Sequence, residues 1–131
     1  MELTKKQSFW AAVCAIQALI AVAAGAFGAH GLKAIVPQQN LEWWQTGCQY
    51  LMYHALAGFV MILLSSWRAR LITPVKLFTS GSICFSGSLF IMTLSDIRQF
   101  GVVTPVGGLL YVVGWGVAIY CFIKYRKKEV N

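Results

Sequence analysis

Residues 44–64, with the sequence WQTGCQYLMYHALAGFVMILL, run for 21 positions without a charged side chain. A helix of that length rises about 30 Å, which matches the hydrocarbon core of a bilayer. Hydrocarbon offers no hydrogen-bond partner, so the segment must be a helix unless it belongs to a closed barrel. The continuous apolar run FVMILL at 59–64 contradicts the alternating polarity of a barrel strand. The stretch therefore predicts a transmembrane helix.

Three further stretches share this property, at residues 9–27, 77–94 and 102–123. Hydrophobic residues make up 58% of the 131-residue chain and charged residues 11%, whereas soluble domains carry about 25% charged residues. This composition excludes a soluble enzyme, a disordered protein and a disulfide mini-protein. We expect an all-α integral membrane four-helix bundle that forms a single domain over residues 1–131. Its helices are expected at about 8–28, 41–66, 74–95 and 104–124.

The basic residues predict the orientation of these helices. Both termini are expected in the cytoplasm of a bacterial inner-membrane protein, because short cytoplasmic segments carry an excess of Lys and Arg. Nine basic residues fall on one side (Lys5, Lys6, Arg68, Arg70, Lys76, Lys124, Arg126, Lys127 and Lys128), and two on the other (Lys33 and Arg98). The net charge of +7 then indicates contact with anionic lipids at the cytoplasmic face and no nucleic-acid partner. Lys5 and Lys6 before an apolar run also resemble a signal peptide, but the run is too long, so we expect a retained first helix.

Local signals place the ends of the predicted helices. Thr-Pro pairs at 73–74 and 104–105 each precede an apolar run. Threonine is a good N-cap and proline suits the first helical position, so we expect the third and fourth helices to begin near these prolines. Gly28 and Gly31 predict a glycine stop for the first helix. Trp44 is expected at headgroup depth, before the second helix enters the hydrocarbon.

Small and polar residues are predicted to line the interior of the bundle. Lipid tails give helices no hydrophobic reason to associate, so contacts depend on small residues and buried polar groups. Such residues recur at helical spacing as Gln17, Ala21, Gly25 and Ala29, as Gly47, Leu51, His54 and Gly58, as Ser80, Cys84 and Ser88, and as Gly107, Gly114 and Ala118.

Two polar residues fall near the middle of the predicted spans. Gln17 lies eight residues into the first charge-free stretch, and His54 lies ten residues into the second. The rise of 1.5 Å per residue places both near the bilayer midplane. We therefore expect a midplane polar layer in which Gln17 bonds His54, with Ser86 or Ser82 nearby.

His54 is an ionisable group within a span, which makes it a candidate functional residue. The four acidic residues, Glu2, Glu42, Asp96 and Glu129, all lie outside the charge-free stretches. A proton path through His54 would therefore have no carboxylate. We expect a structural hydrogen bond from this residue, with a transport or catalytic role as the alternative.

His30, Asp96 and Arg98 are candidate residues at the outer end of the bundle. Two histidines at different depths without acidic neighbours form a poor ligand set, so no metal is expected. Asp96 and Arg98 stand two positions apart, and we expect a solvated local pair or bonds to helix-end amides. The four cysteines fall one per predicted helix without a paired motif and are interpreted as packing residues. No nucleotide-binding loop is present, and no cofactor is expected.

Four motifs in order along the chain resemble a known family. They are GAFGAHGL at 25–32, YHAL at 53–56, GSLF at 87–90 and TPVGG at 104–108. The chain resembles the family of small membrane proteins designated UPF 0382 or DUF 423. The resemblance implies a multi-pass inner-membrane protein whose biochemical role is not established, and it carries over no catalytic residue. Within the motifs, His30 and His54 are the positions to substitute first.

Three classes of function remain open. The first is a non-enzymatic interaction or accessory subunit, which joins a larger membrane complex or self-associates through its small-residue helix faces. The alternative is an oligomeric transporter or channel subunit that uses a midplane layer of His54 and Gln17. A membrane enzyme acting on a lipid or quinone is the third class, with His30 and Asp96 as its only visible acid–base residues.

Overall fold

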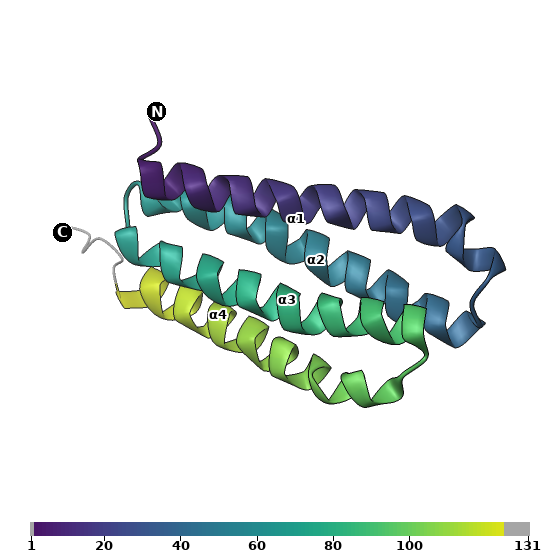
Figure 1. The fold of residues 1–131 in the computed structure, drawn as a ribbon. Coiled ribbons are helices and arrows are strands. Elements are labelled where there is room, and N and C mark those ends of the chain that lie inside the picture. The colour runs from purple at the N-terminus through teal and green to yellow at the C-terminus, as the bar shows by residue number, and fades with distance from the viewer. Residues whose placement is uncertain (1, 125–131) are drawn as a thin grey trace, which may run out of the picture.

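A computed structural model describes residues 2–124 as four long α-helices with a short 3₁₀ helix in each connection (Figure 1). The charge-free stretches thus correctly predict an all-α chain. The basic residues expected at 126–128, and Glu129, lie outside the described residues. The long helices are α1 (Lys5–His30), α2 (Gln38–Ser65), α3 (Ile72–Ser95) and α4 (Thr104–Lys124). The connections contain η1 (Leu32–Ala34), η2 (Ala69–Leu71) and η3 (Arg98–Val102).

Helix α1 begins three residues before the position expected from the sequence. Thr4 and Gln7 form a capping box: the Thr4 hydroxyl accepts from the Gln7 amide at 3.2 Å, and the Gln7 side chain accepts from the Thr4 amide at 2.9 Å. This pair satisfies two amides that the first turn leaves without helical partners. The helix therefore starts at Lys5, outside the apolar run.

The expected cap of α3 is wrong, whereas the expected glycine stop of α1 is correct in position. Helix α3 begins at Ile72 without a side-chain cap, and Pro74 falls third in the helix, where an amide has no helical partner to lose. Gly31 is the C-cap of α1, although its φ of −72° is right-handed and the chain continues directly into η1. The small size of glycine is needed at this position, because a Cβ on residue 31 would lie 3.0 Å from the Phe27 ring.

The long helices pack in chain order, each antiparallel to the next (Figure 1). Helix α1 also approaches α3, but α1 and α4 have no Cα atoms within 8 Å of each other, and neither do α2 and α4. Helices α2 and α3 therefore form the centre of the described bundle. Side chains supply the contacts between α2 and α4.

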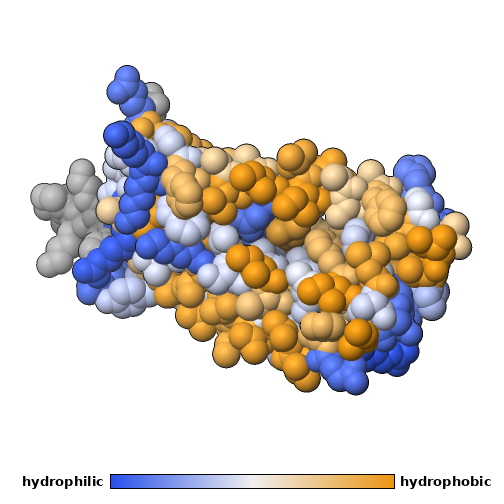
Figure 2. All heavy atoms as spheres, viewed as in Figure 1, coloured by the Kyte–Doolittle hydropathy of each residue, from blue (hydrophilic) through white to orange (hydrophobic). Residues whose placement is uncertain are grey.

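All four helices are long and apolar enough to cross a membrane, with mean hydropathy of 1.5 to 2.0 over their most apolar windows. Less than half of each window is buried inside the bundle. Figure 2 shows the result, a broad apolar middle between hydrophilic ends. Such a surface suits hydrocarbon as the surrounding solvent and far exceeds the apolar patches of soluble monomers.

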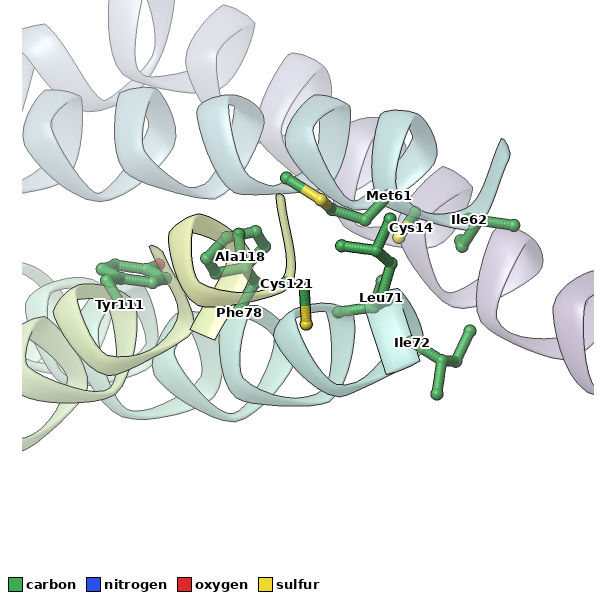
Figure 3. Close-up of a cluster of buried hydrophobic side chains, with 10 residues drawn as sticks. Cys14, Met61, Ile62, Leu71, Ile72, Phe78, Tyr111, Ala118 and Cys121 are labelled. Atoms are coloured by element: carbon green, nitrogen blue, oxygen red, sulfur yellow. The ribbon is translucent and has the colours of Figure 1, made fainter. Parts of the chain in front are cut away.

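A hydrophobic cluster at the end where α1 begins joins all four helices (Figure 3). Cys14 of α1, Phe78 of α3 and Cys121 of α4 are almost fully buried in it. Cys14 also marks a close approach of α1 to α2, because a Cβ on Gly58 would lie 2.5 Å from its sulfur. These thiols fill space in the core, and all four cysteines are free.

The predicted small-residue stripes are partly correct. All four positions expected on α2 are buried. On α1 the buried face follows Gln17, Ala21 and Gly28, whereas Ala29 is exposed. A strict four-residue repeat advances about 40° per step around a helix, so it drifts off one face. On α3 the expected Ser80 is exposed, and its hydroxyl donates to the backbone of its own helix.

The Trp44 side chain is buried between α1 and α2, near the start of α2. Its indole Nε1 donates to the carbonyl oxygen of Ala24 at 2.7 Å. Gly28 makes room for the ring, since a Cβ there would lie 2.6 Å from Trp44. The indole is thus a structural clamp with its polar atom satisfied by backbone.

Candidate functional site

A groove of about 430 Å³ lies between α1 and α3, with α2 as its floor. Apolar side chains form most of its wall, including Ile16 and Ile20 of α1, Ile83 of α3 and Leu51 of α2. Ile83 is 70% exposed and Ile20 45% exposed, so the groove opens sideways from the bundle. It would therefore open into lipid in a membrane.

Gln17 is the principal polar residue of the groove. Its Nε2 donates to the Val13 carbonyl oxygen and to the Thr79 hydroxyl, both at 3.3 Å, which ties the amide to α1 and α3. Its Oε1 is buried and has no donor within the described part of the chain. Leaving such an acceptor unsatisfied costs about 1–3 kcal/mol. A residue that lines the groove therefore keeps one buried, unfilled hydrogen-bond acceptor.

His54 occupies a separate site between α2 and α4. Its Nδ1 lies 2.8 Å from the Tyr50 carbonyl oxygen, and its Nε2 accepts from the Trp115 indole at 3.2 Å. An indole nitrogen can only donate, so the proton of the neutral imidazole belongs on Nδ1. The ring also stacks on Tyr111, with centroids 3.5 Å apart. Both ring nitrogens of His54 are therefore engaged.

Two serines of α3 stand between these sites. The Ser82 hydroxyl lies 2.9 Å from the Tyr111 hydroxyl, and the Ser86 hydroxyl donates to the Gly47 carbonyl oxygen at 2.7 Å. Both serines also line the α1–α3 groove. Ser82 therefore connects the groove to the aromatic cluster around His54.

The expected hydrogen bond between Gln17 and His54 is wrong. Gln17 bonds Val13 and Thr79, while His54 bonds Tyr50 and Trp115. The two residues belong to different helix pairs, because Gln17 faces α3 and His54 faces α4. The two residues lie at comparable levels along the bundle. They do not meet, because their side chains point in different directions around the helix axes.

The end of the bundle where α2 begins and α3 ends is held by a polar cluster that joins these two helices. Asn40 Nδ2 donates to the Thr93 carbonyl oxygen at 3.3 Å and to Asp96 Oδ1 at 3.1 Å. The Thr93 hydroxyl donates back to the Asn40 carbonyl oxygen at 2.9 Å. Asp96 follows α3 with a φ of 57°, in the left-handed region. This conformation turns the chain and suits aspartate better than most residues.

The expected local pair of Asp96 with Arg98 is wrong as well. Asp96 bonds Asn40, while the Arg98 guanidinium lies 5.6 Å from the centre of the Trp43 ring. His30 is exposed in the last turn of α1. Within residues 2–124, no three His, Cys, Asp or Glu side chains gather closely enough to hold a metal ion.

The residues that complete these sites were not expected there from the sequence. Tyr111 and Trp115 lie deep in the fourth charge-free stretch, far from the interfaces where such residues are usually found. This unusual position could have marked both residues as candidates for the site. Thr79, Asn40 and Thr93 gave none, because threonine and asparagine occur in many helices without long-range partners.

Four apolar helices with polar sites between them define a multi-pass α-helical membrane protein. A family model described as "Protein of unknown function (DUF423)" matches residues 24–108. The UPF0382 membrane protein YwdK of Bacillus subtilis is 42% identical, over 85% of this chain and 93% of its own length. The UPF0382 inner membrane protein YgdD of Escherichia coli is 34% identical, over 89% of this chain and 91% of its own. This chain belongs to that family, and no solved structure matches it.

Proposed function

We propose that this protein is a non-enzymatic interaction subunit of the bacterial inner membrane. The α1–α3 groove carries the proposal, because it opens toward lipid and is lined by Gln17, whose buried Oε1 has no donor among the described residues. Transmembrane helices associate through close packing and hydrogen bonds. Gly87 lines the groove, and a Cβ there would meet nothing within 4 Å. This glycine therefore leaves room for a helix from outside the chain.

The cytoplasmic placement of both termini is part of the proposal. The start of α1, the α2–α3 connection and the end of α4 lie at one end of the bundle (Figure 1). That end carries most of the basic residues among the described positions: Lys5, Lys6, Arg68, Arg70, Lys76 and Lys124. Anionic lipid headgroups at the cytoplasmic face would attract these charges.

Single cysteines test this orientation. Leu3 and Ile35 are exposed at opposite ends of the bundle, at 37% and 73%. A membrane-impermeant thiol reagent should label Ile35→Cys in intact spheroplasts, and Leu3→Cys only after the membrane is opened. The unsubstituted protein measures background from the native thiols. The reverse pattern would invert the proposed topology.

Site-specific photo-crosslinking tests the interaction function. A photoreactive residue at Ile83 or Ile20, on the rims of the groove, should give one protein product of fixed mass in native membranes. The same residue at Leu109, which is exposed on α4, is the matched lipid-facing control and should give none. Gly87→Leu should fill the groove and abolish the product. Crosslinking from the groove to lipid alone would exclude the proposal.

The transporter alternative has less support from the geometry. The hydrogen bonds of Gln17 and those of His54 share no residue. Proton transfer through His54 would require breaking its bond to Tyr50 or to Trp115. Proteoliposomes that dissipate a pH gradient, and lose this activity in His54→Ala, would favour transport instead.

A further inference from the structure

The outward face of α2 carries an exposed ridge with no partner helix in the described bundle. Tyr53, Leu56, Val60 and Leu63 form this ridge, and each is about half exposed. Their spacing of three, four and three residues is the one that packs a helix side against neighbouring helices. Like the groove, the ridge faces what would be lipid.

Tyr53 is the polar member of the ridge. Its ring lies 5.8 Å from that of Tyr50, but its hydroxyl has no hydrogen-bond partner among residues 2–124. It lies twelve residues before Ser65, the last residue of α2, so it stands about 18 Å from that helix end. Tyrosine is usually found at the membrane interfaces, where water satisfies its hydroxyl. Tyr53 is instead an unfilled donor deep in the membrane.

The unfilled donor and the unfilled acceptor lie at similar depths. Gln7 Nε2 donates to the Ser65 hydroxyl at 3.0 Å, which fixes α1 and α2 side by side at that level. Gln17 lies ten residues from Gln7, about 15 Å along α1. Tyr53 lies about 18 Å along α2 from Ser65. Gln17 and Tyr53 therefore differ in depth by only about two residues' rise.

The two groups cannot meet within one chain. Leu51 of α2 forms the floor of the groove. Tyr53 is two residues further along α2, which turns its side chain about 200° away from Leu51. A second copy with the same orientation in the membrane would have its own Tyr53 at the depth of Gln17. Its α2 would run antiparallel to α1 and α3, as the floor helix already does.

We propose that the α1–α3 groove holds α2 of a second copy of this chain, and that the Gln17 side chain turns toward the groove so that its Oε1 accepts from the Tyr53 hydroxyl of that copy. The inference rests on the proposed interaction function, since it names the helix that the groove receives. Each copy has one groove and one ridge on different faces, so the contact is heterologous and extends from copy to copy, as a ring where the rotation closes and as an open row where it does not. A lipid acyl chain could fill the groove but has no donor for Gln17.

Association of purified protein in liposomes tests this contact. Förster transfer between labelled copies should report self-association, and Tyr53→Phe should weaken it about threefold or more, the effect of one hydrogen bond between transmembrane helices. Tyr50→Phe is the matched control and should change association little. In a Gln17→Leu background, Tyr53→Phe should have no further effect, because the acceptor is already gone.

Crosslinking from Ile83 identifies the occupant independently. The expected product is a dimer of this chain whose crosslink maps to the α2 ridge. A product with a different protein would overturn the second copy as occupant and leave the interaction function standing. Dimers that form equally well with Tyr53→Phe would overturn the Tyr53–Gln17 contact. Crosslinks to lipid alone would contradict both the interaction function and the second copy as occupant.

Discussion

His54 of α2 lies flat against Tyr111 of α4, with ring centroids 3.5 Å apart and 7° between the ring planes. Trp115 donates to the edge of the same imidazole. The backbones of α2 and α4 do not approach within 8 Å between Cα atoms, so these side chains bridge the two helices. The histidine within the span therefore holds the bundle together in this structure.

Trp115→Phe should destabilise the bundle, because His54 Nε2 loses its donor while the ring at 115 remains aromatic. The expected loss in the free energy of unfolding is about 1–2 kcal/mol, measured by denaturant titration in bicelles. Val112→Ala is the matched control on the lipid-facing side of α4, where the side chain is 68% exposed. Equal stability of Trp115→Phe and the unsubstituted protein would show that the bond contributes nothing.

The neutral imidazole of His54 should carry its proton on Nδ1. The reason is that Trp115 can only donate to Nε2, which leaves Nδ1 as the donor to the Tyr50 carbonyl oxygen. Nitrogen-15 NMR of histidine-labelled protein distinguishes the two tautomers. Trp115→Phe should remove this preference, and an Nε2 proton in the unsubstituted protein would contradict the geometry.

Gly58→Ala should push α1 away from α2. The added Cβ would lie 2.5 Å from the Cys14 sulfur, and overpacking of this kind costs about 1–3 kcal/mol. Gly116→Ala is the matched control, because a Cβ there meets nothing within 4 Å. In thermal unfolding, Cys14→Ala combined with Gly58→Ala should recover part of the stability lost by Gly58→Ala alone. A Gly58→Ala protein as stable as the control would refute the close contact.

Asn40→Ala should loosen locally the end of the bundle where α2 begins and α3 ends. The substitution removes bonds to the Thr93 carbonyl oxygen and to the Asp96 carboxylate, worth about 1–3 kcal/mol for a buried amide. Hydrogen exchange should accelerate at the start of α2 and the end of α3, and remain unchanged at the start of α1. Arg98→Ala, which removes only a contact with the Trp43 ring, should have a smaller effect. Uniform acceleration throughout the chain would argue against a local clamp.

Much of the fold follows from the sequence because hydrocarbon imposes a simple rule. A charge-free stretch as long as residues 44–64 must form its own backbone hydrogen bonds, and a helix does so. The expected and observed bounds of the four helices agree to within three residues. The largest differences are at the starts of α1 and α2, where polar residues at the membrane edge extend the helices.

The candidate site was only half predictable. Gln17, His54 and Ser86 were correctly expected inside the bundle, because a polar side chain within an apolar span avoids lipid. The hydrogen-bond partners of these three residues were not predicted. Thr79, Tyr111 and Trp115 entered no prediction, and Asp96 bonds Asn40 from another helix in place of Arg98 nearby in sequence.

The sequence by itself determined that this is a four-helix membrane protein and where along each helix the polar residues fall. Both results follow from the length of each charge-free stretch, the placement of the charged residues and the fixed rise per residue of a helix. All three are local properties of the chain. Only the tertiary structure decided which helix each side chain faces, how α1 and α3 leave a groove over α2, and that Gln17 keeps an unfilled acceptor there. Those outcomes depend on side-chain packing between helices, where one glycine such as Gly58 sets how closely two backbones approach.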